Sequence, residues 1–442
     1  MAVTPKYDPN EIEALRLHVN ELQQKLESYR RIKNLGKLFL TGAARAVANK
    51  LATRAAAPVA LGTGPKVDFF ALNPNFKPYG IQLRAPQEPA AGRRLKVLHV
   101  IPVFTTGGSQ QLIVDIIEGL SDRIEHEVLV RVQHPEQGYV GVPVHHCPSL
   151  REPGEFQPFL DRIRPDVVHV HYWGEWRHYE EWKWYHNVFQ ASLRAGCQVV
   201  ENCNNPLMPY LHEGIARYVF VSEYARRTFG VAGRLNQVIY PGSNFAFFER
   251  AGTVPDPDTI GMVYRLDKDK LNESSIDPLL KAVQRRPGTR ALVVGGGYYL
   301  EAFREKVAAC GLADRFTFTG YVAYDDLAAH YRQMAVFVAP VHKESFGQVT
   351  PFAMHMGIPV VAYNVGALDE ILVSPDVLAP SQDSDAMADL IVSLLDDPTR
   401  RAAIGAYNRA RATELFSVET MVAAYAELYA SLVPADVSVT AA

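Results

Sequence analysis

Continuously apolar, strand-like runs alternate with helical stretches twice along this chain. In the first part, a run at 96–102 precedes a glycine-bearing turn and an amphipathic stretch at 111–120, and further strand candidates lie at 127–131, 167–171, 198–201 and 218–222. The second part restarts the pattern with candidates at 260–264, 291–294, 315–319 and 335–338. Strands that are apolar throughout are typical of parallel sheets buried on both faces. The helices between the strands would cover those two faces. The sequence therefore predicts an α/β protein with two Rossmann-like domains.

The composition fits two domains of ordinary size and argues against several other classes of protein. The chain has 442 residues, 48% of them hydrophobic and 21% charged, with a formal net charge of −3, which is typical of soluble globular proteins. Its four cysteines lack CxxC spacing, which argues against a metal site or a disulfide framework and favours a reducing compartment. No apolar run approaches the roughly 20 residues that span a bilayer, and residues 1–27 are too polar for a signal peptide. We expect a cytoplasmic protein whose membrane association, if it has one, is peripheral.

The segment from 337 to 372 places an acidic residue between two strand-like runs. Residues 337–341 and 359–363 are expected to be short buried strands, and 348–356 can form a helix after a turn at Phe346 and Gly347. Glu344 follows the first of these strands, so its carboxylate and the amides of the helix's first turn should face one place. A sugar hydroxyl and a phosphate can be held together at such a place.

Cations and glycines follow other predicted strands. Arg265 and Lys270 lie in the sequence YRLDKDK, just after the first strand of the second part. Two cations there can neutralise a leaving pyrophosphate, whose charge grows in the transition state; exposed loop charges are the alternative. Gly107 and Gly108, after the first strand, and Gly295, after another, let the backbone approach a ligand closely. A simple tight turn is the alternative for Gly295.

An aromatic cluster follows the strand that ends at His171. All four tryptophans lie in it, at positions 173, 176, 182 and 184. Because ligands of open parallel sheets bind beyond the carboxyl ends of the strands, the cluster could stack on the sugar rings of an acceptor. A buried cover for the sheet or a protein-binding face is the alternative. We take His171, Trp173 and Trp176 as candidate acceptor-binding residues, although a lone histidine is more often structural.

These segments resemble the signature of the retaining, nucleotide-sugar-dependent glycosyltransferases of GT-B fold, group 4. Nine residues of 337–372 match it: Glu344, Phe346, Gly347, Ala353, Met354, Gly357, Pro359, Val360 and Val361. Arg265, Leu266 and Lys270 match a second motif of the family. The chain departs from the pattern at Phe352, where the family has a ribose-binding Glu, at Tyr264, where it has Gly, and after Val200, where it often has a histidine.

The resemblance implies a domain organisation over roughly residues 95–430. Two Rossmann-like domains would face a cleft: an acceptor domain at 95–250 and a donor-binding domain at 251–415. A crossing helix and tail at 416–442 would return to the first domain.

The resemblance also implies the site. Glu344, Arg265 and Lys270 would be the catalytic residues, and the donor would be bound by Gly107, Gly108, Gly295, Tyr321, Val322, Phe346, Gly347 and Gln348. The implied activity is that of a retaining hexosyltransferase, which moves a sugar from a nucleotide-sugar co-substrate, without a metal or other cofactor, to a carbohydrate, lipid-linked or protein acceptor in glycan or polysaccharide biosynthesis. Two alternatives stay open: a catalytically weakened GT-B scaffold or regulatory partner, suggested by Phe352 and the missing histidine, and a nucleotide-sugar epimerase of similar fold.

The N-terminal part lies outside this resemblance. Apolar residues at three-four spacing between 11 and 33 predict a helix that either mediates self-association or packs on its own domain. Residues 28–67 contain no Asp or Glu but eight Lys or Arg, which favours a helix lying on an anionic membrane surface, at the inner face of the membrane. A solvated linker helix is the alternative. Binding to nucleic acid is disfavoured because Phe39 is the only aromatic residue between the basic residues that could stack on a base. We expect a helical extension over 1–60 and a linker over 61–94.

Overall fold

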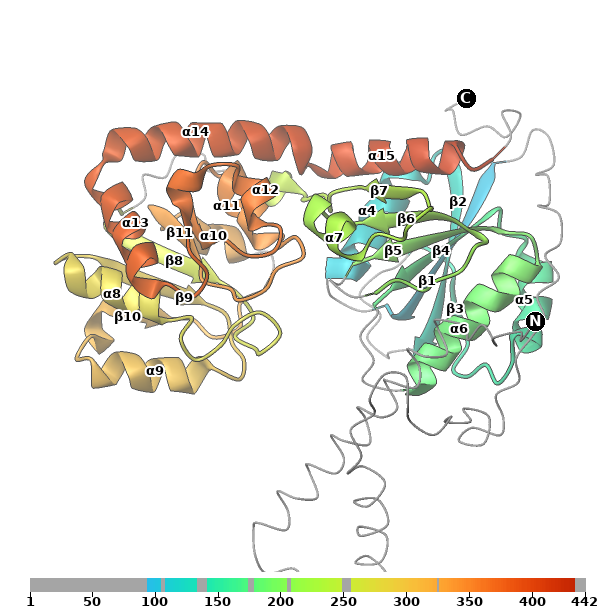
Figure 1. Ribbon diagram of the computed structural model, residues 1–442, viewed down its shortest axis with the longest axis horizontal. Helices are drawn as coiled ribbons and strands as arrows, with labels where there is room; N and C mark the ends of the chain where they lie inside the picture. The colour runs from blue at the N-terminus through green and yellow to red at the C-terminus, as the bar shows by residue number, and fades with distance from the viewer. Residues whose placement is uncertain are drawn as a thin grey trace, which may run out of the picture.

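The computed structural model describes residues 94–104, 108–132, 141–173, 179–204, 208–248, 256–323 and 326–433. The expected helical extension at 1–60 and all but the last residue of the expected linker lie outside these residues, as do Gly107, Trp176 and the expected domain boundary at 250. The described chain forms two parallel sheets, each flanked by helices (Figure 1). The prediction of two Rossmann-like domains is confirmed.

The first domain is built on a seven-stranded sheet with the order β3-β2-β1-β4-β5-β6-β7. Its strands are β1 (Leu95–Val103), β2 (Ile124–Val132), β3 (Val144–His146), β4 (Val167–Tyr172), β5 (Gln198–Cys203), β6 (Ile215–Phe220) and β7 (Asn236–Val238). The helices between them are α4 (Gly108–Leu120), the 3-10 turn η1 (Pro153–Phe156), α5 (Gln157–Ile163), α6 (Tyr179–Arg194) and α7 (Glu223–Phe229).

The second domain is built on a six-stranded sheet with the order β10-β9-β8-β11-β12-β13. Its strands are β8 (Thr259–Val263), β9 (Arg290–Val294), β10 (Phe316–Phe318), β11 (Val336–Ala339), β12 (Val360–Tyr363) and β13 (Leu378–Ala379). Its helices are α8 (Asp277–Arg285), α9 (Leu300–Ala309), α10 (Leu327–Tyr331), α11 (Val349–His355), α12 (Leu368–Leu372), α13 (Ser384–Asp396) and α14 (Pro398–Leu415), with 3-10 turns η2 (Phe245–Phe248), η3 (Ala313–Arg315) and η5 (Pro375–Val377).

Burial explains why the apolar runs form the inner strands. Every residue of β4, β8, β11 and β12 is buried, because helices cover both faces of each sheet. Several helices begin where a short polar side chain accepts a hydrogen bond from a first-turn amide: Ser222 before α7, Asp383 before α13, Asp397 before α14 and Ser417 before α15 (Val418–Ala430). These caps satisfy backbone donors that the helix itself leaves unpaired.

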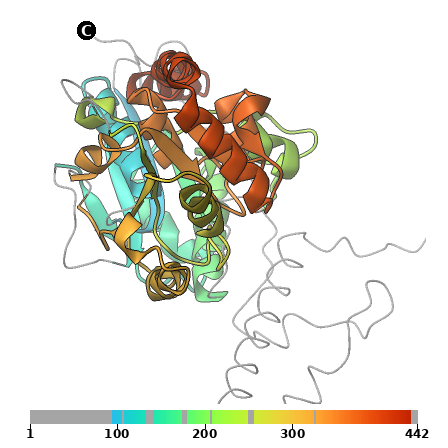
Figure 2. The same ribbon diagram turned by 90° about the vertical axis from the view of Figure 1, so that its left-hand side faces the viewer.

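The last helix, α15 (Val418–Ala430), returns to the first domain. Figure 1 shows α14 above the second domain and α15, directly after it, above the first, and Figure 2 looks along both helices from the side of the second domain. Met421, Tyr425, Leu428 and Tyr429 pack in one apolar cluster with residues of β1 and α4. Helix α15 therefore packs on the first domain although it follows the second in the sequence. Among the described residues, no helix is long and apolar enough to cross a bilayer.

Candidate active site

Loops from the carboxyl ends of both sheets meet at one place. The Ser345 hydroxyl, after β11, donates to the carbonyl of Asn204, after β5, over 3.4 Å. The Gln348 amide donates to the carbonyl of Gly242 over 3.2 Å, and its oxygen lies 3.3 Å from the position that a Cβ on Gly108 would take. Gly108 of the predicted glycine turn thus lies next to Gln348 of the predicted donor loop.

The structure also brings Lys270 and Glu344 together. The Lys270 ammonium lies 2.9 Å from each oxygen of the Glu344 carboxylate, and the Ser345 amide donates to that carboxylate over 3.1 Å. Glu344 is 3% exposed, whereas the Lys270 side chain is 37% exposed. A buried carboxylate is tolerated when it is paired and hydrogen-bonded in this way. The exposed side of the ammonium remains open to a ligand.

Gly347 is required where the chain turns over this carboxylate. Its φ is +82°, and a Cβ at this position would lie 2.6 Å from Glu344 Oε2. Any other residue would therefore strain the backbone and collide with the buried acid. Phe346, one residue earlier, is buried against Phe416 and Tyr240. The burial of Phe346 thus anchors the turn in the apolar core.

Arg265 does not join Glu344 but is held by acids of its own loop. Its guanidinium contacts Asp269 Oδ2 at 2.5 Å and Asp267 Oδ2 at 3.2 Å. The side chain is 62% exposed, and a guanidinium has five N–H donors, so donors remain for an anion. Of the two expected cations, Lys270 thus lies beside Glu344, whereas Arg265 is largely exposed and pairs with acids of its own loop.

The other expected donor-binding residues of the second domain lie at the ends of neighbouring strands. The Gly295 amide, after β9, donates to the Gly320 carbonyl over 3.1 Å, and a Cβ on Gly295 would lie 1.9 Å from the Tyr264 carbonyl oxygen. Tyr321, after β10, is 76% exposed, and Val322 is half-buried. The carboxyl edge of this sheet therefore presents an exposed aromatic ring.

The two aromatic departures from the family pattern are core residues. Phe352 is 5% exposed and stacks on Phe248, with ring centroids 4.0 Å apart and planes within 9°. Tyr264 is also 5% exposed. Position 352 consequently offers no polar group to a ribose.

The aromatic cluster after His171 mainly covers the sheet. Trp182, Trp184 and Tyr185 lie on α6 and are each 1% exposed, which confirms the alternative interpretation for these residues. Trp173 is half-buried against the cluster that includes Ile101 and Phe104. Stacking on an acceptor through α6 was a wrong interpretation because its aromatic face points into the core.

His171 is fully buried and belongs to a histidine cluster that the sequence reasoning missed. His99 on β1 and His169 on β4 are also 0% exposed, and one nitrogen of each of the three lies within 4.8 Å of the others. Such a donor set is also one that a metal ion could use. The sequence did contain a signal for this cluster, because His99, His169 and His171 interrupt strands that are otherwise apolar.

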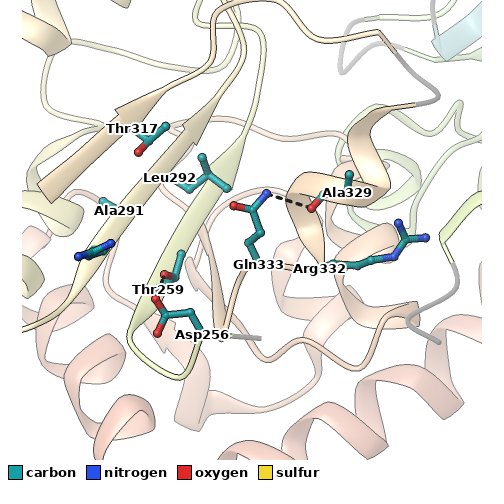
Figure 3. Close-up of a pocket in the computed structure, with 9 residues that line it drawn as sticks. Asp256, Thr259, Ala291, Leu292, Thr317, Ala329, Arg332 and Gln333 are labelled. Carbon is teal, nitrogen blue, oxygen red and sulfur yellow. Dashed lines mark hydrogen bonds between the residues drawn. The ribbon is translucent and has the colours of Figure 1, made fainter. Parts of the chain in front are cut away.

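A separate hollow of about 480 Å³ lies at the opposite end of the second sheet. Figure 3 shows Thr259 and Asp256 on one side of it, with Ala329 and Gln333 on α10 and its C-terminal end on the other. Thr259 is the first residue of β8, so this hollow is at the amino ends of the strands. It is not part of the site around Glu344.

Comparisons with known proteins agree with this geometry. Residues 244–411 match the family described as Glycosyl transferases group 1. The lipopolysaccharide core biosynthesis mannosyltransferase LpsB of Rhizobium meliloti is 33% identical over 190 residues, which are 41% of this chain and 54% of that protein. The GDP-mannose-dependent alpha-(1-6)-phosphatidylinositol monomannoside mannosyltransferase of Mycobacterium tuberculosis is 30% identical over 243 residues, 49% of this chain and 62% of that protein. The chain thus spans between half and two thirds of these curated relatives.

Solved structures extend the likeness to both domains. HepE from Anabaena, in complex with UDP and glucose, has a TM-score of 0.61 and 22% identity, covering 76% of this chain and 100% of that one. Sucrose-phosphate synthase from Thermosynechococcus elongatus has a TM-score of 0.63 and 20% identity, covering 77% of this chain and 99% of that one. At such identity the likeness shows the fold alone. The fold is therefore that of the GT-B glycosyltransferases, and residues 244–411 match the model of the glycosyl transferases group 1.

Proposed function

We propose that this protein is a retaining glycosyltransferase that moves a sugar from a nucleotide-sugar donor to a carbohydrate, lipid-linked or protein acceptor in glycan or polysaccharide biosynthesis. The observation that carries the proposal is the Lys270–Glu344 pair beneath the Gly347 turn, where loops of both domains meet. The names of the relatives, which are mannosyltransferases, and the UDP and glucose bound by HepE support the substrate class.

The pair suggests how the leaving group is stabilised. An ammonium has three N–H donors; Lys270 directs two contacts at Glu344 and keeps an exposed side for the donor's pyrophosphate. Arg265, exposed in the same loop, supplies a second cation. Their charge favours the transition state in which the bond from the anomeric carbon to the phosphate oxygen breaks. The acceptor oxygen bonds to that carbon on the same face, and its proton passes to the leaving phosphate.

A Glu344→Gln variant tests the proposal, because the amide keeps the shape of the side chain but not its charge. We expect kcat to fall by about 100-fold or more when product is measured by mass spectrometry with a panel of UDP- and GDP-sugars. The anomeric configuration of the product, determined by NMR, should match that of the donor.

The matched control is Asp385→Asn, which makes the same change in an exposed pair with Lys281, 2.6 Å apart, elsewhere in the second domain. It should leave transfer unchanged. Wild-type turnover in Glu344→Gln at saturating donor would remove Glu344 from the site, and conversion of the donor without any acceptor would identify an epimerase instead.

We also propose that residues 28–67, with eight basic and no acidic residues, attach the protein to anionic membranes. Each basic residue near such a surface contributes about 1 kcal/mol. Full-length protein should sediment with vesicles containing phosphatidylserine at low salt but not with neutral vesicles, and deletion of residues 1–60 should abolish sedimentation while donor binding persists. If full-length protein does not sediment with the anionic vesicles, we expect instead that the apolar residues spaced along 11–33 mediate self-association. Self-association should then appear in analytical ultracentrifugation.

A further inference from the structure

Helix α15 carries two fully buried tyrosines whose hydroxyl groups bond to different strands of the first domain. The Tyr425 hydroxyl donates to Asn202 Oδ1 on β5 over 2.5 Å. The Tyr429 hydroxyl, one helical turn later, lies 2.7 Å from His169 Nδ1 on β4. A phenylalanine would fill either place without the cost of burying a hydroxyl, so these two bonds do more than pack the helix.

The bond of Tyr425 continues along β5 to the edge of the sheet. Asn202 Nδ2 donates to Asn204 Oδ1, just after the strand, and residues two apart on a strand point to the same face. Val200, two residues before Asn202, packs in the same apolar cluster as Tyr425. Positions 200, 202 and 204 thus lead from the face that α15 covers to the carboxyl edge, where loops of both domains meet.

Asn204 connects this face of the first sheet to the second domain. Its backbone carbonyl accepts the hydrogen bond of the Ser345 hydroxyl over 3.4 Å, and the Ser345 amide donates to the Glu344 carboxylate over 3.1 Å. We call this connection the asparagine path, which runs in order through Tyr425, Asn202, Asn204, Ser345 and Glu344.

The two ends of the asparagine path differ in how firmly they are held. Asn202 is fully buried, and because an unpaired buried amide is costly, its bonds to Tyr425 and Asn204 hold it in one orientation. The last step is looser, since 3.4 Å is long for a hydrogen bond from a hydroxyl. A small shift of Asn204 would therefore break its contact with Ser345.

We propose that Tyr425 is a positioning residue for the transfer reaction: its hydroxyl, through Asn202 and Asn204, holds Ser345 and thereby the Glu344 carboxylate in place. A helix that follows the second domain in the sequence thus supports the site of that domain by way of the first. This inference rests on the proposed function for its effect on turnover. Its effect on the loop after β11 does not depend on that function.

Hydrogen–deuterium exchange of full-length protein, followed by mass spectrometry, tests the path without an assay of activity. In Tyr425→Phe, backbone amides of the peptide 342–348 should exchange faster than in wild type, because the loop loses its support from the first domain. The control is Tyr429→Phe, which removes an equally buried hydroxyl of the same helix and should leave this peptide unchanged.

Two results of the exchange experiment would overturn the proposal. One is unchanged exchange of the peptide in Tyr425→Phe, and the other is equal acceleration in both tyrosine variants, which would mean that α15 acts by packing alone. Asn204→Ala cuts the path at a partly buried residue and should accelerate exchange as Tyr425→Phe does. It takes the place of Tyr425→Phe if that variant does not fold.

Turnover shows whether this positioning matters for transfer. Tyr425→Phe should lower kcat by about tenfold, because misplacement of a catalytic group is costly, while the KM of the nucleotide-sugar changes little and Tyr429→Phe behaves as wild type. In a Ser345→Ala background the path is already broken, so Tyr425→Phe should have no further effect on kcat. Losses of kcat that multiply in the double variant would refute the path. Absence of transfer by the wild type with every UDP- and GDP-sugar would instead count against the proposed function and leave the exchange result standing.

Discussion

Lys270 and Glu344 are separated by 74 residues in the sequence, and their pairing ties the loop after β8 to the loop after β11. The His342 amide strengthens this tie by donating to the Lys270 carbonyl over 3.0 Å. The acid cannot be left alone in this setting, since a buried carboxylate without its cation is strongly disfavoured. The pair, which we propose faces the donor, is therefore also a structural link within the second domain.

Phe352 provides a residue-scale prediction, because it stands where the signature that this chain resembles has a Glu. Phe352→Glu would place a carboxylate against the ring of Phe248 and should lower the free energy of unfolding by about 3–5 kcal/mol. Phe352→Leu, which stays apolar, should cost about 1.5 kcal/mol. Urea denaturation of the two variants measures the difference. Equal stability together with tighter donor binding by Phe352→Glu would mean that this side chain faces the donor.

The position of Glu344 after a strand end could be predicted from the sequence, because carboxyl ends of parallel strands share one edge of a sheet. The surroundings of Arg265 could not. Asp267 and Asp269 are close to it in sequence, but which cation of the loop they would hold depends on the loop's backbone path. The cluster of His99, His169 and His171 was likewise hidden, since it depends on the register between β1 and β4.

Among the elements, α6 shows where a sequence pattern is ambiguous. Trp182, Tyr185 and Phe189 are spaced three and four residues apart and are all buried, which is the spacing of one helix face. The same segment also contains charged and polar residues, which is why its aromatic residues could equally have been exposed and available to a sugar. Packing against β4 and β5 decided between the two, and this contact is not visible in the local pattern.

Helix α4 carries a pH-dependent contribution to stability. Burial raises the pKa of Asp115 to about 6, and its carboxyl accepts a bond from Gln111 over 2.8 Å. Because the folded-state pKa is above the unfolded value of about 4, stability that is present below about pH 4 is lost as the pH rises through about 6. Asp115→Asn should abolish that loss and stabilise the protein by about 2 kcal/mol above pH 7, with little effect near pH 4. Denaturant unfolding at both pH values checks this, and parallel pH profiles for variant and wild type would contradict it.

At the scale of the whole molecule, Glu370 joins the two domains. Its carboxylate, on α12 of the second domain, accepts bonds from the amides of Glu223 and Tyr224 at the start of α7 in the first domain, over 2.8 and 2.7 Å. Arg411 also fixes the position of α12, because its guanidinium donates to the carbonyls of Glu370 and Ile371. The relative position of the domains thus depends on this side chain as well as on the crossing helix and on the contacts of Ser345 and Gln348.

Glu370→Ala should therefore loosen the arrangement of the domains. Both amides of α7 lose their acceptor, and we expect a larger radius of gyration in small-angle X-ray scattering. Asp397→Ala is the matched control, because Asp397 also accepts a bond from a helix amide, that of Arg400 over 2.9 Å, but within one domain. It should cost about 1 kcal/mol of stability without changing the scattering. Identical scattering curves for Glu370→Ala and wild type would show that α15 and the contacts of Ser345 and Gln348 set the arrangement without Glu370.

Helix α15 has a further consequence, for the order in which the protein is made. The face formed by Leu95, Val97 and Leu112 in the first domain is covered by Tyr425, Leu428 and Tyr429, which the ribosome adds only after the entire second domain. Until then the first sheet has all of its strands but only part of its cover. A nascent chain stalled before residue 418 should consequently display an apolar surface to molecular chaperones, and folding of the domain made first is completed by the helix made last.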